Sequence, residues 1–353
     1  MSAPSRMSRL LIPVLVVLIA VIGWRAWQGA TIERPGPNPP VVAMTPWGQR
    51  IVPTVDTLAE IAIWNSLKPG QPWNSGLAAG KEVRQKYAAG KIKVSRTPWA
   101  IADRVWAIGP WNTEQNIYLI DTGQGLILFD PSLDLYQPEV EAQIRGLGFQ
   151  PEQVKWVVLS HCHIDHGQSC RTWQKRGAKV ILGAADAPEL EQCSDVVAAW
   201  FVPEAKNRCT PCGADIKVAG GEVLQFGDLK LHVIDSSGHT PGSTSFAFQR
   251  SGKWHLLSGD VVLHNGRHAW MGGNKADWGL YLAALGRLAR FSVDGMPVRF
   301  DLLLPGHGAI ELDQGQRSVE LTERAVRSLV ARRMAGEKVE RLYAYPWLWE
   351  NPN

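Results

Sequence analysis

The stretch His161-Cys162-His163-Ile164-Asp165-His166-Gly167 contains the pattern HxHxDH and directly follows an apolar run at 156–159. Imidazole nitrogens and carboxylate oxygens are donors that zinc, iron and manganese bind in proteins. Donors of the same two kinds recur in three short motifs further along the chain: Gly238-His239-Thr240-Pro241-Gly242, Gly259-Asp260 and Pro305-Gly306-His307-Gly308. Together these motifs hold five of the nine histidines in the chain.

The four motifs share one position in the predicted secondary structure, because each follows an apolar run with the composition of a β-strand. The runs cover residues 156–159, 231–234, 254–257 and 302–304. Turns at strand ends can converge on one edge of a sheet, where a rigid scaffold positions them. We therefore expect seven donors to form one site: His161, His163, Asp165, His166, His239, Asp260 and His307.

Seven donors are enough to hold two divalent ions side by side, since a catalytic zinc keeps about three protein ligands. Two sets are predicted: His161, His163 and His239 for one ion, and Asp165, His166 and His307 for the other. Asp260, with two carboxylate oxygens, is the predicted bridge. We expect two Zn²⁺, with iron or manganese as alternatives. A metal-bridging hydroxide is a nucleophile near neutral pH, so the pattern predicts a metal-dependent hydrolase.

Two residues are predicted to act in catalysis, Asp165 of the metal-binding string and His264. Four histidines lie outside the motifs: His232, His255, His264 and His268. The last two follow Asp260 closely, which makes them candidates to face the substrate, whereas the first two are interpreted as structural. Glycines beside the ligands are expected to allow tight turns and a close approach of the backbone to the centre.

The chain has five cysteines: Cys162, Cys170, Cys193, Cys209 and Cys212. The last two form a CxxC motif, which is compatible with a zinc knuckle, a redox pair or a local disulfide. A structural zinc would need two more ligands, and only Cys193 stands nearby, so we predict a disulfide within 193–212 and leave the pairing open. Cys162 lies between the predicted ligands His161 and His163 in an extended segment, where alternate side chains point to opposite faces. Its side chain is therefore expected to point away from the metals and into the core.

The N-terminus resembles a targeting signal. Arg6 and Arg9 precede a fifteen-residue apolar run at 10–24, which Arg25 ends. A spanning helix needs roughly 20 apolar residues and a signal-peptide core roughly 7–15, so a retained anchor and a cleaved signal peptide are both compatible. The lack of a small-x-small cleavage site favours the anchor. In a bacterium, either form places the rest of the chain in the periplasm, tethered to the inner membrane or free.

Three segments are expected along the chain. They are 1–30, a signal anchor or signal peptide; 31–98, a proline-rich spacer with a short helical extension predicted at 57–67 and 81–89; and 99–353, the catalytic domain. From residue 99 predicted strands alternate with helices, which indicates a layered α/β domain. The strands are predicted at 105–108, 117–120, 126–129, 156–159, 180–182, 231–234, 245–248, 254–257 and 302–304, and the helices at 138–147, 169–176, 187–200, 277–289 and 313–335.

Composition is that of an ordinary globular protein, with 45% hydrophobic and 20% charged residues. The net charge of +4 is too small to indicate a nucleic-acid partner. We expect a small-molecule substrate and contact with the membrane through the N-terminal apolar segment only. The oligomeric state is left open.

The motifs resemble those of the metallo-β-lactamase superfamily over residues 99–335. The segments 116–123 and 126–130 are similar to the opening strand pair of that family, and the HxHxDH string, the GHTPGS turn, the GD after a strand and the PGHG turn follow in the family's order. The resemblance implies a four-layer αββα sandwich with two zinc ions at one edge of its sheets. It also implies a hydrolase that attacks an ester, lactone, thioester or amide bond.

Two differences from known subfamilies narrow the choice of subfamily. The 73-residue gap between His166 and His239 is similar to the third subclass of zinc β-lactamases, but members of that subclass lack the bridging aspartate that Asp260 supplies here. Acyl-homoserine lactonases carry a tyrosine shortly after this aspartate, where the present chain has Val261-Val262-Leu263-His264. Two other functions stay open: a non-heme iron oxidoreductase, as in flavodiiron proteins or persulfide dioxygenases, and a metal-bearing accessory or binding protein of the periplasm.

Overall fold

The computed structural model describes residues 41–45, 48–51, 55–66, 73–91, 98–109, 115–199, 209–268 and 270–337. The predicted N-terminal anchor or signal, residues 1–30, lies outside this part of the chain. Within the described ranges, no helix combines the length and the apolar character that crossing a membrane requires.

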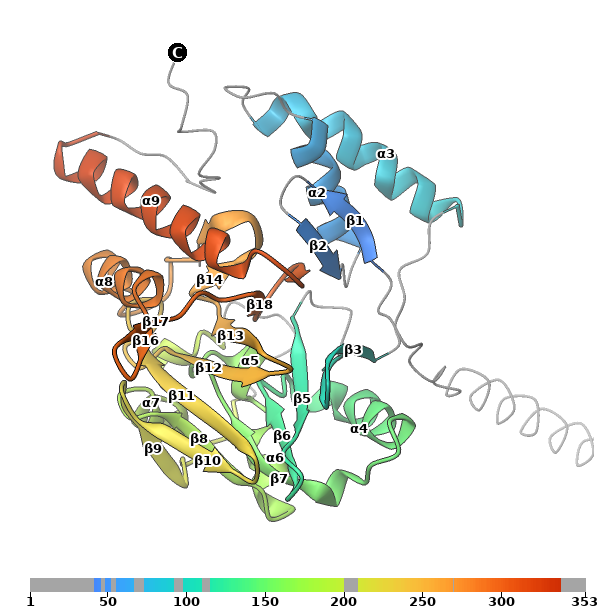
Figure 1. Ribbon diagram of the computed structural model, residues 1–353, viewed down its shortest axis with the longest axis vertical. Coiled ribbons are helices and arrows are strands. Elements are labelled where there is room, and N and C mark those ends of the chain that lie inside the picture. The colour runs from blue at the N-terminus through green and yellow to red at the C-terminus, as the bar shows by residue number, and fades with distance from the viewer. Residues whose placement is uncertain are drawn as a thin grey trace, which may run out of the picture.

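Two β-sheets form the middle layers of the molecule (Figure 1). One has seven strands in the order β3 (Trp99–Ala102), β4 (Val105–Ile108), β5 (Ile117–Asp121), β6 (Leu126–Phe129), β7 (Val154–Val158), β8 (Lys179–Gly183) and β9 (Ile216–Val218). The other has eight, in the order β1 (Val41–Thr45), β2 (Gly48–Ile51), β19 (Ile310–Glu311), β18 (Leu302–Pro305), β13 (Lys253–Gly259), β12 (Thr244–Arg250), β11 (Leu229–Asp235) and β10 (Val223–Phe226). Strands β6 to β9 run parallel, as do β13 and β18.

Helices cover the outer face of each sheet. The seven-stranded sheet carries α4 (Gln137–Gly146), α6 (Cys170–Lys175) and α7 (Ala187–Gln192), and the eight-stranded sheet carries α8 (Trp278–Ala289) and α9 (Gly315–Met334). The layers therefore follow the order α, β, β, α, which confirms the predicted sandwich. Every predicted strand from 105 onward overlaps an observed one.

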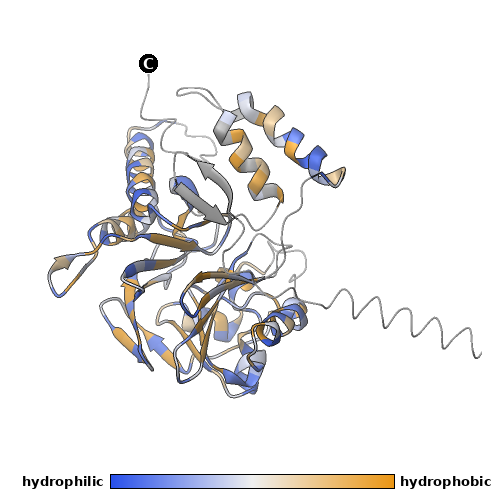
Figure 2. Ribbon diagram, turned by 45° about the vertical axis from the view of Figure 1, so that its right-hand side comes forward, coloured by the Kyte–Doolittle hydropathy of each residue, from blue (hydrophilic) through white to orange (hydrophobic). Residues whose placement is uncertain are grey.

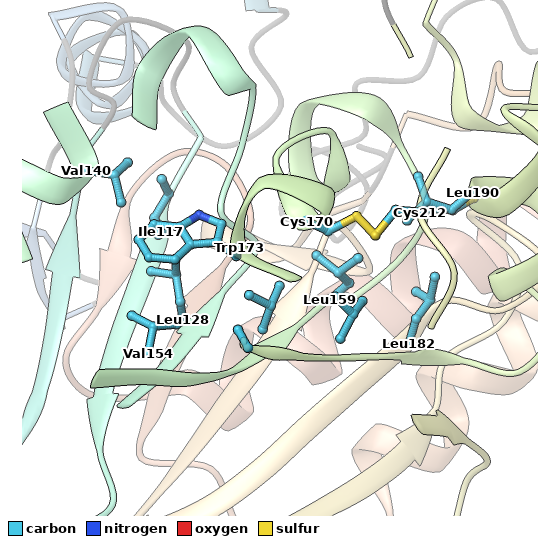
Figure 3. Close-up of a cluster of buried hydrophobic side chains, with 14 of the residues drawn as sticks. Ile117, Leu128, Val140, Val154, Leu159, Cys170, Trp173, Leu182, Leu190 and Cys212 are labelled. Carbon is cyan, nitrogen blue, oxygen red and sulfur yellow. A yellow bond between two sulfur atoms is a disulfide. The ribbon is translucent and has the colours of Figure 1, made fainter. Parts of the chain in front are cut away.

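Successive side chains of a strand point to opposite faces of its sheet, and apolar residues on both faces explain why each sheet is covered on both sides. Leu128 and Leu119 point outward and belong to the cluster with the helices, whereas Phe129 and Ile120 point inward and belong to the core between the sheets. In the outer cluster, Trp173 of α6 packs close to Leu128 (Figure 3), and its indole N–H donates to Gln137 at 2.7 Å. Figure 2 shows hydrophobic residues on both sheets.

His255 is a structural histidine of the core, as predicted. It is 0% exposed and stacks on Phe248 with ring centroids 4.7 Å apart. Burial lowers its pKa to about 4. The unfolded chain binds this proton near pH 6.5, so the stability that neutral His255 confers is complete above that pH and declines as the pH falls towards 4.

We therefore expect the variant His255→Phe to lose less stability in acid than the wild type. Between pH 7 and pH 4.5, the free energy of unfolding should fall by about 2–3 kcal/mol more in the wild type than in the variant, because each unit of pKa shift corresponds to about 1.36 kcal/mol. Urea unfolding at pH 7 and pH 4.5 measures it. Equal losses of stability for the two proteins would contradict this assignment.

The N-terminal extension differs from the predicted spacer. Strands β1 and β2 form a hairpin that joins the eight-stranded sheet through β19, where Ile51 pairs with Ile310. Helices α2 (Val55–Ser66) and α3 (Leu77–Ala88) follow, close to the predicted positions. Ile61 of α2 packs on Ala309, two residues after His307. The predicted boundary at residue 99 therefore does not mark the start of the sandwich.

The predicted helix at 187–200 is wrong in length. Helix α7 ends at Gln192 because Cys193 takes a left-handed conformation with φ 47°, and a 3₁₀ turn, Asp195–Val197, follows. Cys193 is bonded to Cys209, so a disulfide does lie within the predicted region. A second disulfide joins Cys170 to Cys212 (Figure 3), which leaves no cysteine pair for a zinc knuckle in this part of the structure.

Candidate metal centre

All seven predicted donors meet where strands end at one edge of the sandwich. His161 and His163 lie just after β7, and α5 (Ile164–Gly167) begins at once and carries the next two donors. His239 lies in the turn after β11. Asp260 follows β13 and His307 follows β18, and these two strands are parallel neighbours, with Leu257 opposite Leu304. The strand-end placement predicted from the sequence is therefore confirmed.

The first cluster contains His161, His163 and His239. Their ring centroids are 4.6 Å apart for the first pair, 4.5 Å for the second and third residues, and 4.7 Å for the first and third. One nitrogen from each ring lies within 4.8 Å of the other two. All three side chains are buried. Three convergent imidazoles at this spacing form a candidate site for one divalent ion.

The second cluster contains Asp165, His166 and His307. The Oδ2 atom of Asp165 lies 3.2 Å from Nε2 of His307, and the Nε2 atoms of the two histidines are 3.2 Å apart. The side chains of Asp165 and His307 are each about a quarter exposed, so this cluster reaches towards solvent. It is the second candidate site.

Asp260 lies between the two clusters. Its Oδ2 atom is 3.6 Å from Nε2 of His239 and 3.5 Å from Nε2 of His307, while Oδ1 is 3.5 Å from Nε2 of His166. These separations are longer than ordinary hydrogen bonds. The carboxylate therefore faces donors of both clusters, the position that a bridging ligand requires.

Four buried donor atoms of the centre have no hydrogen-bond partner among the described residues. They are Nε2 of His161, His163 and His239, and Oδ1 of Asp260. A buried polar atom left without a partner costs about 1–3 kcal/mol. Metal ions bound between these atoms would satisfy them, so the donor set fits the metals that the sequence predicts.

Outer hydrogen bonds fix how the imidazoles are oriented. Nδ1 of His239 donates to the carbonyl of Trp270 at 2.8 Å, and Nδ1 of His166 donates to Oδ2 of Asp130 at 3.0 Å. The hydroxyl of Ser160 donates to Asp130 at 2.7 Å and accepts from Nδ1 of His161 at 2.8 Å. Because each of these Nδ1 atoms is held by an outer partner, each Nε2 is the ring atom that faces the centre and can bind a metal ion.

These three supporting residues were missed by sequence reasoning. Asp130 directly follows the apolar strand β6, which is the placement the ligands share, so a signal for it was present. It also accepts from the amide of Ser160 at 2.7 Å and takes a left-handed conformation. Trp270 acts through its backbone carbonyl, and no side-chain pattern can reveal that.

Burial keeps the first cluster neutral. Desolvation lowers the pKa of His163 to about 3 and holds the pKa values of His161 and His239 below the usual 6.5. In the second cluster burial acts in the same direction, but the charges of Asp260 and Asp165 outweigh it and raise the pKa of His166 and His307. A metal ion must therefore displace protons from the second cluster and none from the first.

We expect the two clusters to differ in how metal uptake depends on pH. Between pH 8 and pH 6, the affinity of the second cluster for its ion should fall as the pH falls. For each proton that the ion displaces, this affinity should fall by about tenfold per pH unit. The affinity of the first cluster should change little over the same range. Zinc titrations against a competing chelator at several pH values measure both constants. Parallel pH dependence of the two constants would contradict this difference.

His264 lies under the turn of His307. It is 0% exposed, and its Nδ1 accepts from the amide of Ala309 at 3.1 Å, so it supports the turn that carries His307. Its contact with a substrate stays a prediction. Its neighbour His268 packs edge-on against Trp278. Cys162 is buried in the outer core cluster, as predicted, and burial raises the pKa of its thiol.

Comparison with known proteins agrees with this geometry. A family model described as the metallo-beta-lactamase superfamily matches residues 111–294. The chain is 26% identical over 141 residues to Persulfide dioxygenase ETHE1, mitochondrial, of Bos taurus, and 26% identical over 140 residues to that of Mus musculus. Each match covers 40% of this chain and 44% of the relative, so the chain matches less than half the length of these proteins.

Solved structures share the fold at low sequence identity. A metallo-beta-lactamase of Cronobacter sakazakii with a HARLDQ motif is 21% identical with a TM-score of 0.55, over 69% of this chain and 96% of that one. BJP-1, a subclass B3 enzyme of Bradyrhizobium japonicum, is 21% identical with a TM-score of 0.53, over 68% and 95% of the two chains. Since the family model spans more than half of its length, the chain belongs to the metallo-beta-lactamase superfamily.

Proposed function

We propose that this protein is a dinuclear metal-dependent hydrolase, with zinc as its metal, that cleaves an ester, lactone, thioester or amide bond of a small molecule. The observation that carries the proposal is the position of Asp260. Its two oxygens face His239 of one cluster and His166 and His307 of the other. A carboxylate between two complete triads favours two ions over one.

Each triad has a defined role in this proposal. His161, His163 and His239 would hold one ion, Asp165, His166 and His307 the other, and Asp260 would bind both. Two such ions supply an activated water and polarise the acyl carbonyl.

Asp165 is the partly exposed acid of the site. Burial alone would raise the pKa of its carboxyl, but His166 and His307 outweigh burial and lower that pKa. We propose that its Oδ2, held ionised, accepts a hydrogen bond from the attacking water.

A second candidate function is oxidation by bound iron, with no hydrolysis. The observation that favours it is the match to the two persulfide dioxygenases. Imidazole and carboxylate donors suit iron as well as zinc. This alternative predicts an iron-like optical spectrum in the protein as isolated and oxygen uptake with a persulfide.

Metal analysis and a substrate panel distinguish the two functions. Purified protein should contain two zinc ions per chain and hydrolyse at least one of an ester, a lactone, a thioester and nitrocefin, with activity lost on chelation and restored by zinc. Bound iron with oxygen uptake on a persulfide would replace the hydrolase with the dioxygenase. Two bound metals without turnover on any of these compounds would favour a binding or accessory protein.

We also propose that the protein works in the periplasm, held by or released from its N-terminal apolar segment. The two disulfides, Cys170–Cys212 and Cys193–Cys209, support an oxidising compartment. Fractionation of cells that express the full chain tests this proposal. Recovery of the protein from the cytosol with all five thiols reduced would contradict it.

A further inference from the structure

A cleft lies beside the metal centre and shares a turn with it. Its volume is about 820 Å³, within the range of small-molecule sites. None of the seven metal donors lines it. The turn between β11 and β12 contributes Ser237 and Ser243 to its wall, and the same turn carries His239. The two sites are therefore neighbours with separate linings.

The C-terminal end of helix α8 places two arginines in this cleft. Arg287 and Arg290, the residue that caps the helix, are three positions apart and lie on one face. Asp235 accepts from Nε of Arg287 through its carbonyl at 2.9 Å and from Nη2 through its carboxylate at 2.9 Å, which fixes the plane of that guanidinium. Arg290 lies across Gly286, where an added Cβ would overlap its Nη2 atom.

The acidic partners of these arginines do not cancel their charge in the cleft. Arg290 donates from Nη1 to Glu323 at 3.3 Å, but Glu323 also accepts from Arg327 at 2.6 Å and does not line the cleft. Among the lining residues there are two guanidinium groups and one carboxylate, that of Asp235, so the ionised side chains that line the cleft carry a net charge of +1.

The rest of the lining is small and partly apolar. Gly183, Gly220 and Gly221 come from strand β8 and the turn after β9, and an added Cβ at Gly221 would meet no atom within 4 Å. Phe291 and Val233 contribute apolar surface. The cleft thus combines charge and hydroxyl groups at the arginines and serines with room for an apolar body.

We propose that this cleft binds a small organic oxyanion, a carboxylate or phosphoryl group attached to an apolar body. The guanidinium group presents paired donors that match both kinds of oxyanion. Arg287 and Arg290 would bind the anionic group, and Phe291 would contact the apolar part. The site does not depend on the metals or on the proposed hydrolysis.

Binding of 4-fluorobenzoate and 4-fluorophenylphosphonate, followed by ¹⁹F NMR on the full chain, tests the proposal. We expect saturable binding of at least one probe, weakened roughly tenfold in Arg287→Gln and in Arg290→Gln. Arg145→Gln, on α4 in the opposite helical layer, should bind as the wild type does. Since Arg287→Gln also breaks the bridge to Asp235, Ala283→Phe serves as a second variant: it keeps both charges and fills the cleft at an exposed position of α8.

The variant His163→Ala separates this cleft from the metal centre. Binding that survives in His163→Ala and falls in the arginine and Ala283→Phe variants supports the proposal. Binding that disappears in His163→Ala and persists in the arginine variants would assign the anion to the metals and overturn it. Lack of saturable binding of either probe up to about 10 mM would overturn it as well.

Discussion

Replacement of His163 by alanine is expected to remove most bound metal and to lower kcat/KM on any hydrolysed substrate by on the order of 10³-fold or more. His163 is one of three imidazoles in the first cluster, and its Nε2 is buried without a hydrogen-bond partner among the described residues. Two imidazoles cannot hold an ion as three do. Since a bound metal supplies several kcal/mol of transition-state stabilisation, its loss corresponds to a rate factor of this size.

His232→Ala is the matched control for this loss, because it removes an imidazole from the strand that leads to the turn of His239. His232 lies within β11, opposite Ala247 of β12. Its ring contacts Trp254 and Phe291, and it belongs to neither metal cluster. The variant should keep two metals and wild-type turnover, although the lost ring contacts should lower its thermal midpoint slightly.

Metal content by mass spectrometry, kcat/KM and the thermal midpoint are measured together on the wild type and on both variants. The two variants delete the same imidazole atoms, one at the centre and one in the sheet. A loss of metal in His163→Ala alone therefore reports on the centre and not on the sheet. Wild-type metal content and activity in His163→Ala would refute the proposed centre.

The sequence was sufficient to predict that the seven donors converge, because its signals are local. Each motif begins within a few residues of the end of an apolar strand, and parallel neighbours such as β13 and β18 bring Asp260 and His307 together. Short apolar runs likewise predicted the central strands of both sheets, β4 to β8 in one and β11, β12, β13 and β18 in the other. Local pattern and long-range placement agree here, as they do in chains that fold to one structure.

Features that depend on distant partners were not predicted. The hairpin of β1 and β2 joins the sheet only through Ile310 and Glu311 of β19, which lie near the other end of the chain. His264 is close to Asp260 in sequence, but Asn265 takes a left-handed conformation with φ 60°, and the ring of His264 lies under the turn of His307. Closeness of two residues in the sequence does not determine where their side chains point.

Replacement of Gly306 by alanine is expected to weaken metal binding by about 10–100-fold and to lower turnover with it. A Cβ at this position would overlap Oδ1 of Asp260 and would stand 2.8 Å from Cε1 of His166. The backbone of Gly306 is not left-handed, so alanine meets no conformational penalty and the effect is one of space. The carboxylate of Asp260 and the ring of His166 must both shift.

Gly213→Ala provides the comparison, because an added Cβ there would meet Glu191 at an ordinary 3.6 Å and the backbone is again not left-handed. That variant should bind metal and turn over as the wild type does. Measurements of zinc affinity by chelator competition and of kcat/KM distinguish the two variants. In Gly306→Ala the loss should be greater for the ion of the second cluster, since His166 belongs to that triad and Asp260 faces both. Unchanged affinity at both sites would show that the space beside Asp260 does not limit metal binding.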